Sequence, residues 1–252
     1  MLSLIWVRNL ILELAVYSDK KVLLVTNDLG PRSGGIETFI LGLLEGLPKN
    51  SLVIYTSSQK GHAPFDAQLL EKFGATVIRD RAKILLPTPR ITRKAVRILK
   101  QYKIQNVWFG AAAPLGLMAS QLRNGGASNI VALSHGHEVW WAKIPILKHI
   151  LQKIIKDVDK LGYLGAFTKN EISKSTTEVN KLVQVAPGID TNYFQPKKPN
   201  PALIARYQLE GRRVIVCVAR LVHRKGQDQL IKALPSICLL YTSPSPRDGL
   251  LS

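Results

Sequence analysis

The sequence predicts an α/β protein in which helices cover both faces of a parallel sheet. Three observations support this fold class: strand-length runs that are apolar without interruption, helix-patterned segments that alternate with them, and glycine-rich turns between the two. Uninterrupted apolar runs are typical of strands buried on both faces. Regular alternation of strands and helices produces parallel neighbours. We therefore expect a Rossmann-like, doubly wound sheet followed by the start of a second α/β domain.

The elements of the first domain follow one another in this order. Short apolar runs predict strands at residues 21–27, 52–56, 75–79, 106–109, 129–134, 162–167 and 181–185. The segments between them predict helices at residues 36–47, 67–73, 92–102, 114–122, 144–156 and 169–175. In the first helix, Phe39, Ile40 and Leu43 recur at intervals of three or four residues, the spacing of one helical face.

A proline-rich, charged segment at residues 195–201 (QPKKPNP) separates this pattern from a second one. After it, residues 213–218 predict a buried strand and residues 227–234 predict a helix. The expected organisation is an extension at 1–19, a first domain at 20–194, a linker at 195–211, a second-domain fragment at 212–237, and a tail at 238–252. The Ser/Pro-rich tail interrupts the pattern, so we expect it to be artefactual or disordered, the end of a truncated reading frame.

Composition limits the class of protein and its surroundings. The 35 Lys and Arg residues against 17 Asp and Glu give a formal charge of +18, which favours an anionic partner such as nucleic acid, acidic lipid or a phosphorylated ligand. Two cysteines cannot form a disulfide framework, so we expect a reducing compartment. Arg8, Asn9 and Glu13 interrupt the apolar N-terminal segment, which therefore predicts neither a transmembrane helix nor a signal peptide.

The first candidate site is the glycine loop, residues 29–37 (LGPRSGGIE), which follows the first strand and opens the first helix. Glycines such as Gly34 and Gly35 let a ligand approach the backbone, and a helix N-terminus offers unpaired N–H groups. The spacing matches neither the dinucleotide fingerprint nor the P-loop. A tight turn without a ligand stays equally open.

The second candidate is the cluster Ser134-His135-Gly136-His137-Glu138, directly after the fifth strand. Two histidines and a carboxylate at a strand's carboxyl end indicate site residues rather than core residues. A zinc-protease motif is excluded because Trp141 stands where the second histidine would be needed.

The third candidate is the basic loop 218–226, which follows the first strand of the second domain. Arg220 and Lys225 could converge there on a diphosphate, the arginine as a planar fork and the lysine as a point charge. A solvated basic loop is the alternative.

Two other charged features have competing explanations. Asp157 and Asp159 form a DxD-like pair, for which a solvated helix end is favoured over a metal site. Residues 143–160 alternate Ile/Leu with Lys and, with the basic stretch 79–103, could lie on an anionic membrane. An ordinary surface helix is slightly favoured for the first of these. Nucleic-acid binding is not expected, because no known binding motif and no interleaved aromatic residues accompany the cations.

Taken together, the motifs resemble those of family-four retaining glycosyltransferases with the GT-B fold, and most closely the GDP-mannose-dependent phosphatidylinositol mannosyltransferases. The motifs that carry the resemblance are Gly34-Gly35-Ile36-Glu37-Thr38, His135-Gly136-His137-Glu138, Ala186-Pro187-Gly188-Ile189-Asp190 with Phe194, and Arg220 with Lys225-Gly226.

The resemblance implies a role for each motif. It places His135 beside the reacting sugar, and Arg220 and Lys225 at the departing diphosphate as the other catalytic residues. It implies substrate contacts for Gly34, Gly35, Glu37, His137, Glu138, Gly188 and Asp190. It also implies a nucleotide-sugar donor, GDP-mannose favoured, a lipid or glycan acceptor, and no metal or other cofactor.

The resemblance further implies a cytoplasmic protein at the inner face of the membrane. The family's glutamate pair and nucleotide-base pocket would lie beyond Leu234. We therefore expect the fragment to be inactive alone. The alternative is a non-catalytic half-domain that binds sugar or anionic lipid.

Overall fold

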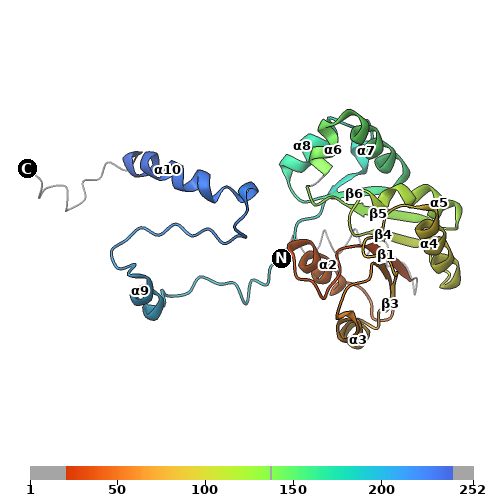
Figure 1. Cartoon of the computed structure of the whole chain (residues 1–252), viewed down its shortest axis with the longest axis horizontal. Coiled ribbons are helices and arrows are strands. Elements are labelled where there is room, and N and C mark those ends of the chain that lie inside the picture. The colour runs from red at the N-terminus through yellow and green to blue at the C-terminus, as the bar shows by residue number, and fades with distance from the viewer. Residues whose placement is uncertain (1–20, 137, 241–252) are drawn as a thin grey trace, which may run out of the picture. The chain divides into compact units, whose positions relative to one another are not determined.

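The computed structural model describes residues 21–136 and 138–240, and its contacts divide the chain into two units (Figure 1). The first unit ends at Asp190 and the second begins at Thr191. The predicted extension and residues 241–252 of the predicted tail lie outside the described residues. The predicted domain bounds stay predictions, although the expected linker contains a helix, α9 (Pro201–Tyr207).

The strands of the first unit form one seven-stranded sheet with the order β3-β2-β1-β4-β5-β6-β7. Their bounds are β1 Val22–Thr26, β2 Leu52–Thr56, β3 Thr76–Arg79, β4 Asn106–Phe109, β5 Asn129–Leu133, β6 Lys160–Tyr163 and β7 Leu182–Gln184. Every neighbouring pair is parallel. All residues of β1, β2 and β4 are buried, as their apolar sequences require. The predicted parallel α/β fold is confirmed.

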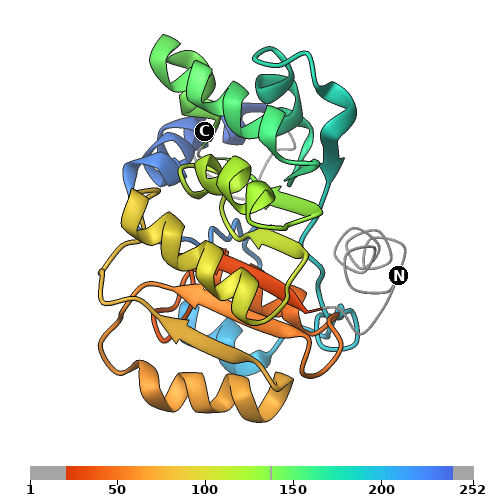
Figure 2. The same ribbon diagram turned by 90° about the vertical axis from the view of Figure 1, so that its right-hand side faces the viewer.

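Helices cover both faces of this sheet (Figures 1 and 2). One face packs on α4 (Pro89–Gln101), α5 (Ala119–Asn124) and α7 (Pro145–Asp157), and the other on α2 (Gly35–Leu44) and α3 (His62–Phe73). The pleat sends neighbouring side chains to opposite cores: Phe109 joins the first and Trp108 the second. The other helical segments of this unit are η1 (Leu115–Met118), α6 (Glu138–Lys143), α8 (Ala166–Ser173) and η2 (Val179–Lys181).

The order of the strands reverses between β1 and β4. These neighbours continue in opposite directions, since β1 leads into α2 on one face and β4 leads into η1 and α5 on the other. In open α/β sheets, ligands bind at the carboxyl ends of the strands at such a switch point. The glycine loop and the turn after β4 therefore lie where a ligand site is expected.

Several predicted boundaries in the first unit are wrong. The strand predicted at 162–167 ends at Tyr163, and Phe167 belongs to α8, which begins after its N-cap residue Gly165. A short apolar run such as this fits either element, and the glycine decides the boundary. Helix α3 begins at His62, five residues before the predicted start, and the short α6 was not predicted.

The second unit contains helices but no strand among its described residues. It holds α9, η3 (His223–Lys225) and α10 (Gln227–Leu240), so the helix predicted at 227–234 is confirmed. The buried strand predicted at 213–218 is wrong, because Val218 is 93% exposed and no described segment pairs with it. A strand is stabilised by its neighbours, and an apolar run alone does not supply them.

Candidate functional site

The glycine loop connects the carboxyl end of β1 to α2. Gly34 is the N-cap of α2 and provides no side-chain cap, so the first amides of the helix can serve an external acceptor. A side chain at Gly34 would collide with the carboxylate of Glu37. Glu37 is buried, and it accepts a hydrogen bond from Nε of Arg32 at 2.8 Å. The predicted substrate residue Glu37 thus orders the loop through Arg32.

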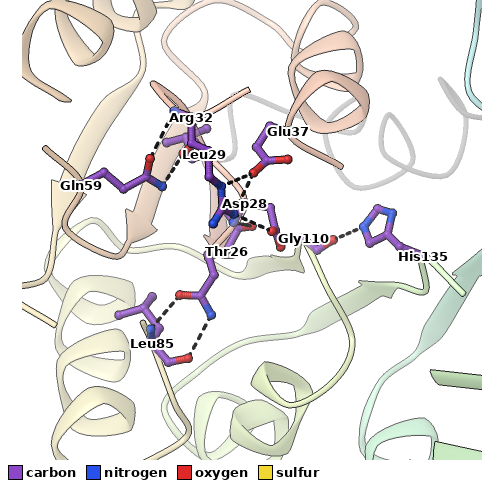
Figure 3. Close-up of polar contacts among 10 residues, drawn as sticks. Thr26, Asp28, Leu29, Arg32, Glu37, Gln59, Leu85, Gly110 and His135 are labelled. Atoms are coloured by element: carbon purple, nitrogen blue, oxygen red, sulfur yellow. Dashed lines mark hydrogen bonds and ion pairs between the residues drawn. The ribbon is translucent and has the colours of Figure 1, made fainter. Parts of the chain in front are cut away.

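Neighbouring side chains hold the backbone of the glycine loop in place (Figure 3). The Gln59 amide donates to the carbonyl of Leu29 at 2.7 Å and accepts from the amide of Arg32 at 3.3 Å. The amide of Asp28 donates to Thr26 Oγ1 at 2.9 Å. These hydrogen bonds therefore hold the loop backbone in one conformation without a ligand.

His135 follows β5 and turns toward the end of β4 (Figure 3). Its Nε2 lies 2.6 Å from the carbonyl oxygen of Gly110. A carbonyl can only accept, so Nε2 carries the proton and Nδ1 of the neutral ring keeps a lone pair. The ring also meets Phe39 of α2 edge-on, with centroids 5.7 Å apart. The structure thus brings His135 next to the helix that the glycine loop opens.

Gly110 fits a position that has no room for a side chain. A Cβ there would lie 2.5 Å from Thr26 Oγ1 and 3.0 Å from Ile40 Cδ1. Its amide donates to the carbonyl of Val25, which ties the turn after β4 to β1. The carbonyl that orients His135 is therefore fixed by the two central strands.

The other members of the histidine cluster have separate environments. His137 lies outside the described residues. Glu138 opens α6 and is buried, and its carboxylate accepts a hydrogen bond from Ser134 Oγ at 2.9 Å. A carboxylate in the first turn of a helix is favoured by the helix dipole. Ser134 and Glu138 thus bond to each other, whereas the described histidine, His135, bonds to the main chain.

The remaining predicted site residues lie at the end of the first unit and in the second. Gly188 and Asp190 are exposed and follow β7. Arg220 is exposed, and its carbonyl accepts from the Gln227 amide at 2.8 Å. Lys225 is exposed and ends η3. Their roles stay predictions.

The DxD-like pair stabilises the first unit. Asp157 pairs with Lys153 at 2.7 Å, one helical turn away. Asp159 accepts from the Ile130 amide at 2.7 Å and from Arg123 at 2.8 Å. No group of three metal-ligating side chains occurs in the part of the chain that the structure describes.

The basic helix predicted at 144–156 is α7, and its apolar stripe is mostly in the core. Leu151, Ile154 and Ile155 are buried against the sheet, which confirms a surface helix packed on the domain. Only its N-terminal end exposes Ile144 and Ile146. Over the described residues, no helix is both long enough and apolar enough to cross a bilayer.

The charged groups at the end of β3 were not predicted as site residues. Asp80 is buried and accepts hydrogen bonds from Arg90, Lys94 and the hydroxyl of Tyr55. The hydrogen bond from Arg90 holds the pKa of the Asp80 carboxyl well below its usual range. Burial, and then the hydrogen bond to Asp80, raise the pKa of Tyr55 above its usual value. Arg79, the residue before Asp80, faces the glycine loop instead and donates to the carbonyl of Gly30.

The first unit has a parallel α/β, Rossmann-like fold, as GT-B glycosyltransferases do. The fold is similar to that in a crystal structure of Anabaena Alr3699/HepE in complex with UDP, with a TM-score of 0.62 and 14% sequence identity. The match covers 86% of this chain and 57% of that one. A second structure, of the same protein with UDP and glucose, matches with a TM-score of 0.59 and 14% identity over 86% of this chain and 58% of that one.

Residues 33–193 match Glycosyltransferase Family 4, and the chain belongs to this family. It is 38% identical over 221 residues to a GDP-mannose-dependent alpha-(1-6)-phosphatidylinositol monomannoside mannosyltransferase of Mycobacterium tuberculosis. It is 36% identical over 224 residues to a related GDP-mannose-dependent mannosyltransferase of Corynebacterium glutamicum. These matches cover 86% and 87% of this chain, and 57% and 58% of the two relatives. The chain therefore spans a little over half the length of the relatives it matches.

Proposed function

We propose that the chain is the acceptor-side part of a mannosyltransferase that transfers mannose from GDP-mannose to a phosphatidylinositol mannoside or a similar glycolipid. The observation that carries the proposal is the identity of 36–38% to named mannosyltransferases across nearly the whole chain. The site supports it, because the glycine loop follows β1 at the switch point of the sheet, and His135 contacts Gly110 after β4 and Phe39 of α2, the helix that the loop opens.

The described residues suggest how the first unit takes part in transfer. The first amides of α2 can bind acidic oxygens of donor or acceptor, since Gly34 leaves them uncapped. Nδ1 of His135 can accept a hydrogen bond from a sugar hydroxyl while Gly110 keeps the ring in one tautomer. These groups position the acceptor for reaction.

Charge stabilisation at the leaving group is assigned to the second unit. As the glycosidic bond to the donor breaks, negative charge grows on the departing diphosphate. Arg220 and Lys225 would neutralise it, which requires no metal ion. Transfer with retention of the anomeric configuration belongs to the same proposal.

Association with an anionic membrane is part of the proposal, at the cytoplasmic face. The acceptor is a lipid in the named relatives, and exposed cations cover one side of α4, at Arg90, Arg93, Arg97 and Lys100. The preceding loop exposes Ile84 and Leu86, which could contact the acyl region.

A second candidate function is acceptor binding without turnover. It is favoured because the glycine loop and His135 both lie in the first unit. The sheet and both hydrophobic cores are formed by residues of that same unit.

One experiment tests both candidates. The chain is mixed with phosphatidylinositol monomannoside and with radiolabelled GDP-mannose or UDP-glucose, and label in the lipid is measured together with saturable lipid binding. Transfer from GDP-mannose supports the mannosyltransferase. Saturable binding without transfer supports the second candidate. Transfer from UDP-glucose alone, or no binding of the lipid, contradicts the proposal.

A further inference from the structure

Two oppositely charged neighbours serve different faces of the sheet: Arg79 ends the edge strand β3, and Asp80 directly follows it. Successive side chains of a strand point to opposite faces. Asp80 contacts Arg90 and Lys94 of α4, whereas Arg79 contacts α3 and the glycine loop. Asp80 thus supports α4, and Arg79 supports the glycine loop.

Arg79 is a nearly buried guanidinium with three different acceptors. Its side chain is 8% exposed. Nη2 donates to the carbonyl of Gly30 at 2.7 Å, and Nη1 donates to the carbonyl of Ser57 at 3.0 Å. Asp66 of α3 accepts from Nε at 3.1 Å and from Nη2 at 2.7 Å, which compensates the charge. One side chain therefore connects the first loop, the end of β2 and α3.

Helix α3 supports the same loop by direct packing. A Cβ at Gly30 would lie 2.5 Å from the ring of Phe65, so the loop backbone rests on that ring. The position of α3 therefore determines the position of Gly30, and the ion pair of Asp66 with Arg79 fixes α3 against β3.

We propose that Arg79 is a positioning residue for the glycine loop. With Asp66 it fixes the carbonyl of Gly30 and thereby the direction in which the uncapped first turn of α2 presents its amides. The consequence for acceptor binding rests on the proposed transferase function, whereas the effect on the loop does not.

The chemistry of the contact explains why arginine is present. A planar guanidinium offers donors in several fixed directions, and here they serve a carboxylate and two carbonyls at once. A lysine at this position keeps the charge but cannot direct donors to all three acceptors. Arg79→Lys therefore separates the contribution of geometry from that of charge.

The test measures amide hydrogen exchange by NMR in the whole chain, for the wild type, Arg79→Gln, Arg79→Lys and Asp66→Asn. We expect exchange of the Arg32 amide to rise at least fivefold in all three variants, because its hydrogen bond to Gln59 depends on the loop position. The amides of β1 should keep their protection. If the lipid binds the wild type, its Kd should rise about tenfold in Arg79→Lys.

Asp80→Asn is the matched control, since it removes the neighbouring buried charge, which directly follows β3 and pairs with α4 instead of the loop. It should lower the melting temperature and leave exchange of the Arg32 amide unchanged. If Arg79→Lys and Asp66→Asn lower only the melting temperature and the Arg32 amide exchanges as in the wild type, the positioning role is overturned. If the wild-type chain does not bind the lipid, the proposed function fails while the exchange result still decides the role of Arg79.

Discussion

His135 depends on a main-chain carbonyl for its chemistry. Because the Gly110 carbonyl accepts from Nε2, the neutral ring must keep its proton there and present Nδ1 as an acceptor. The edge contact with Phe39 restricts rotation of the ring. A catalytic or binding role for His135 thus rests on residues of β4 and α2 as much as on the histidine itself.

The tautomer of His135 can be observed directly. We expect ¹⁵N-edited NMR spectra at pH 8 to show a protonated Nε2 and an unprotonated Nδ1, since only that form donates to Gly110. His62 and His149, whose Nδ1 atoms are in hydrogen bonds, provide internal comparisons. A proton on Nδ1 of His135 would exclude the proposed arrangement.

Gly110→Ala tests how tightly the turn after β4 packs against β1 and α2. The new methyl would meet Thr26 Oγ1 at 2.5 Å, so we expect a loss of about 1–3 kcal/mol in the free energy of unfolding. Gly42→Ala is the control, because its Cβ position in α2 meets nothing within 4 Å outside the adjoining helix backbone, and the change should stabilise the helix by about 0.5–1 kcal/mol. Denaturant unfolding of both variants gives the two values, and equal effects would contradict this account.

The sequence predicted some of these residues and missed others for a physical reason. His135 and the glycine loop follow apolar strands, and the end of a parallel strand is visible in the sequence. Arg79, Gln59 and Gly110 act on residues 25 to 49 positions away, and no local pattern indicates such contacts. Their roles appear only once the strand order is known.

Among the helices, α4 is linked to the sheet by ion pairs with Asp80. The helix begins with Thr88 as N-cap, whose hydroxyl accepts from the Ile91 amide, and with Pro89 in its first turn. Arg90 in the first turn and Lys94 in the second reach the Asp80 carboxylate at 2.8 and 3.1 Å. One buried acid therefore pairs with two cations of the helix, in addition to the apolar packing of its buried face.

The stability that Asp80 provides should depend on pH. Its pKa is lowered in the folded protein, so its contribution is complete above the unfolded pKa of about 4 and is lost as pH falls through the lower folded value. Asp80→Asn should reduce the free energy of unfolding by about 2 kcal/mol at pH 7. The difference from the wild type should shrink below about pH 4, as measured by urea unfolding. A difference that is constant down to pH 2 would contradict the ion pairing.

The predicted strands were most accurate in the buried centre of the sheet. The ranges predicted for β2 and β4 agree with the observed bounds, and the equally buried β1 is one residue shorter at each end than predicted. The prediction failed at 213–218, an equally apolar run, since a strand also needs hydrogen-bonding neighbours. An apolar pattern shows that a segment can be buried, but it does not show whether a neighbouring strand is there to pair with it.

At the scale of the whole molecule, the charge of +18 is the feature most directly related to a partner. Part of it lies on the exposed side of α4, where Arg93 and Arg97 are one turn apart. Each cation near an anionic bilayer contributes about 1 kcal/mol, and salt screens this attraction. This surface would therefore be attracted to an anionic bilayer.

Charge reversal on α4 tests this surface. Arg93→Glu with Arg97→Glu should weaken flotation with phosphatidylglycerol vesicles at least tenfold, and added salt should weaken that of the wild type. Lys49→Glu with Lys60→Glu changes the net charge equally at two exposed positions outside α4 and should have a smaller effect. Equal losses in the two double variants would mean that only the total charge matters.

The proposed division of labour assigns lipid-acceptor binding to the first unit, through His135, and donor contacts to Arg220 and Lys225. Its most direct test is the Kd of phosphatidylinositol monomannoside for the wild-type chain, for His135→Ala, and for Arg220→Ala with Lys225→Ala. We expect saturable binding that is at least tenfold weaker in His135→Ala and unchanged in the double variant. Absent binding, or equally strong binding by His135→Ala, would rule out this role of the first unit.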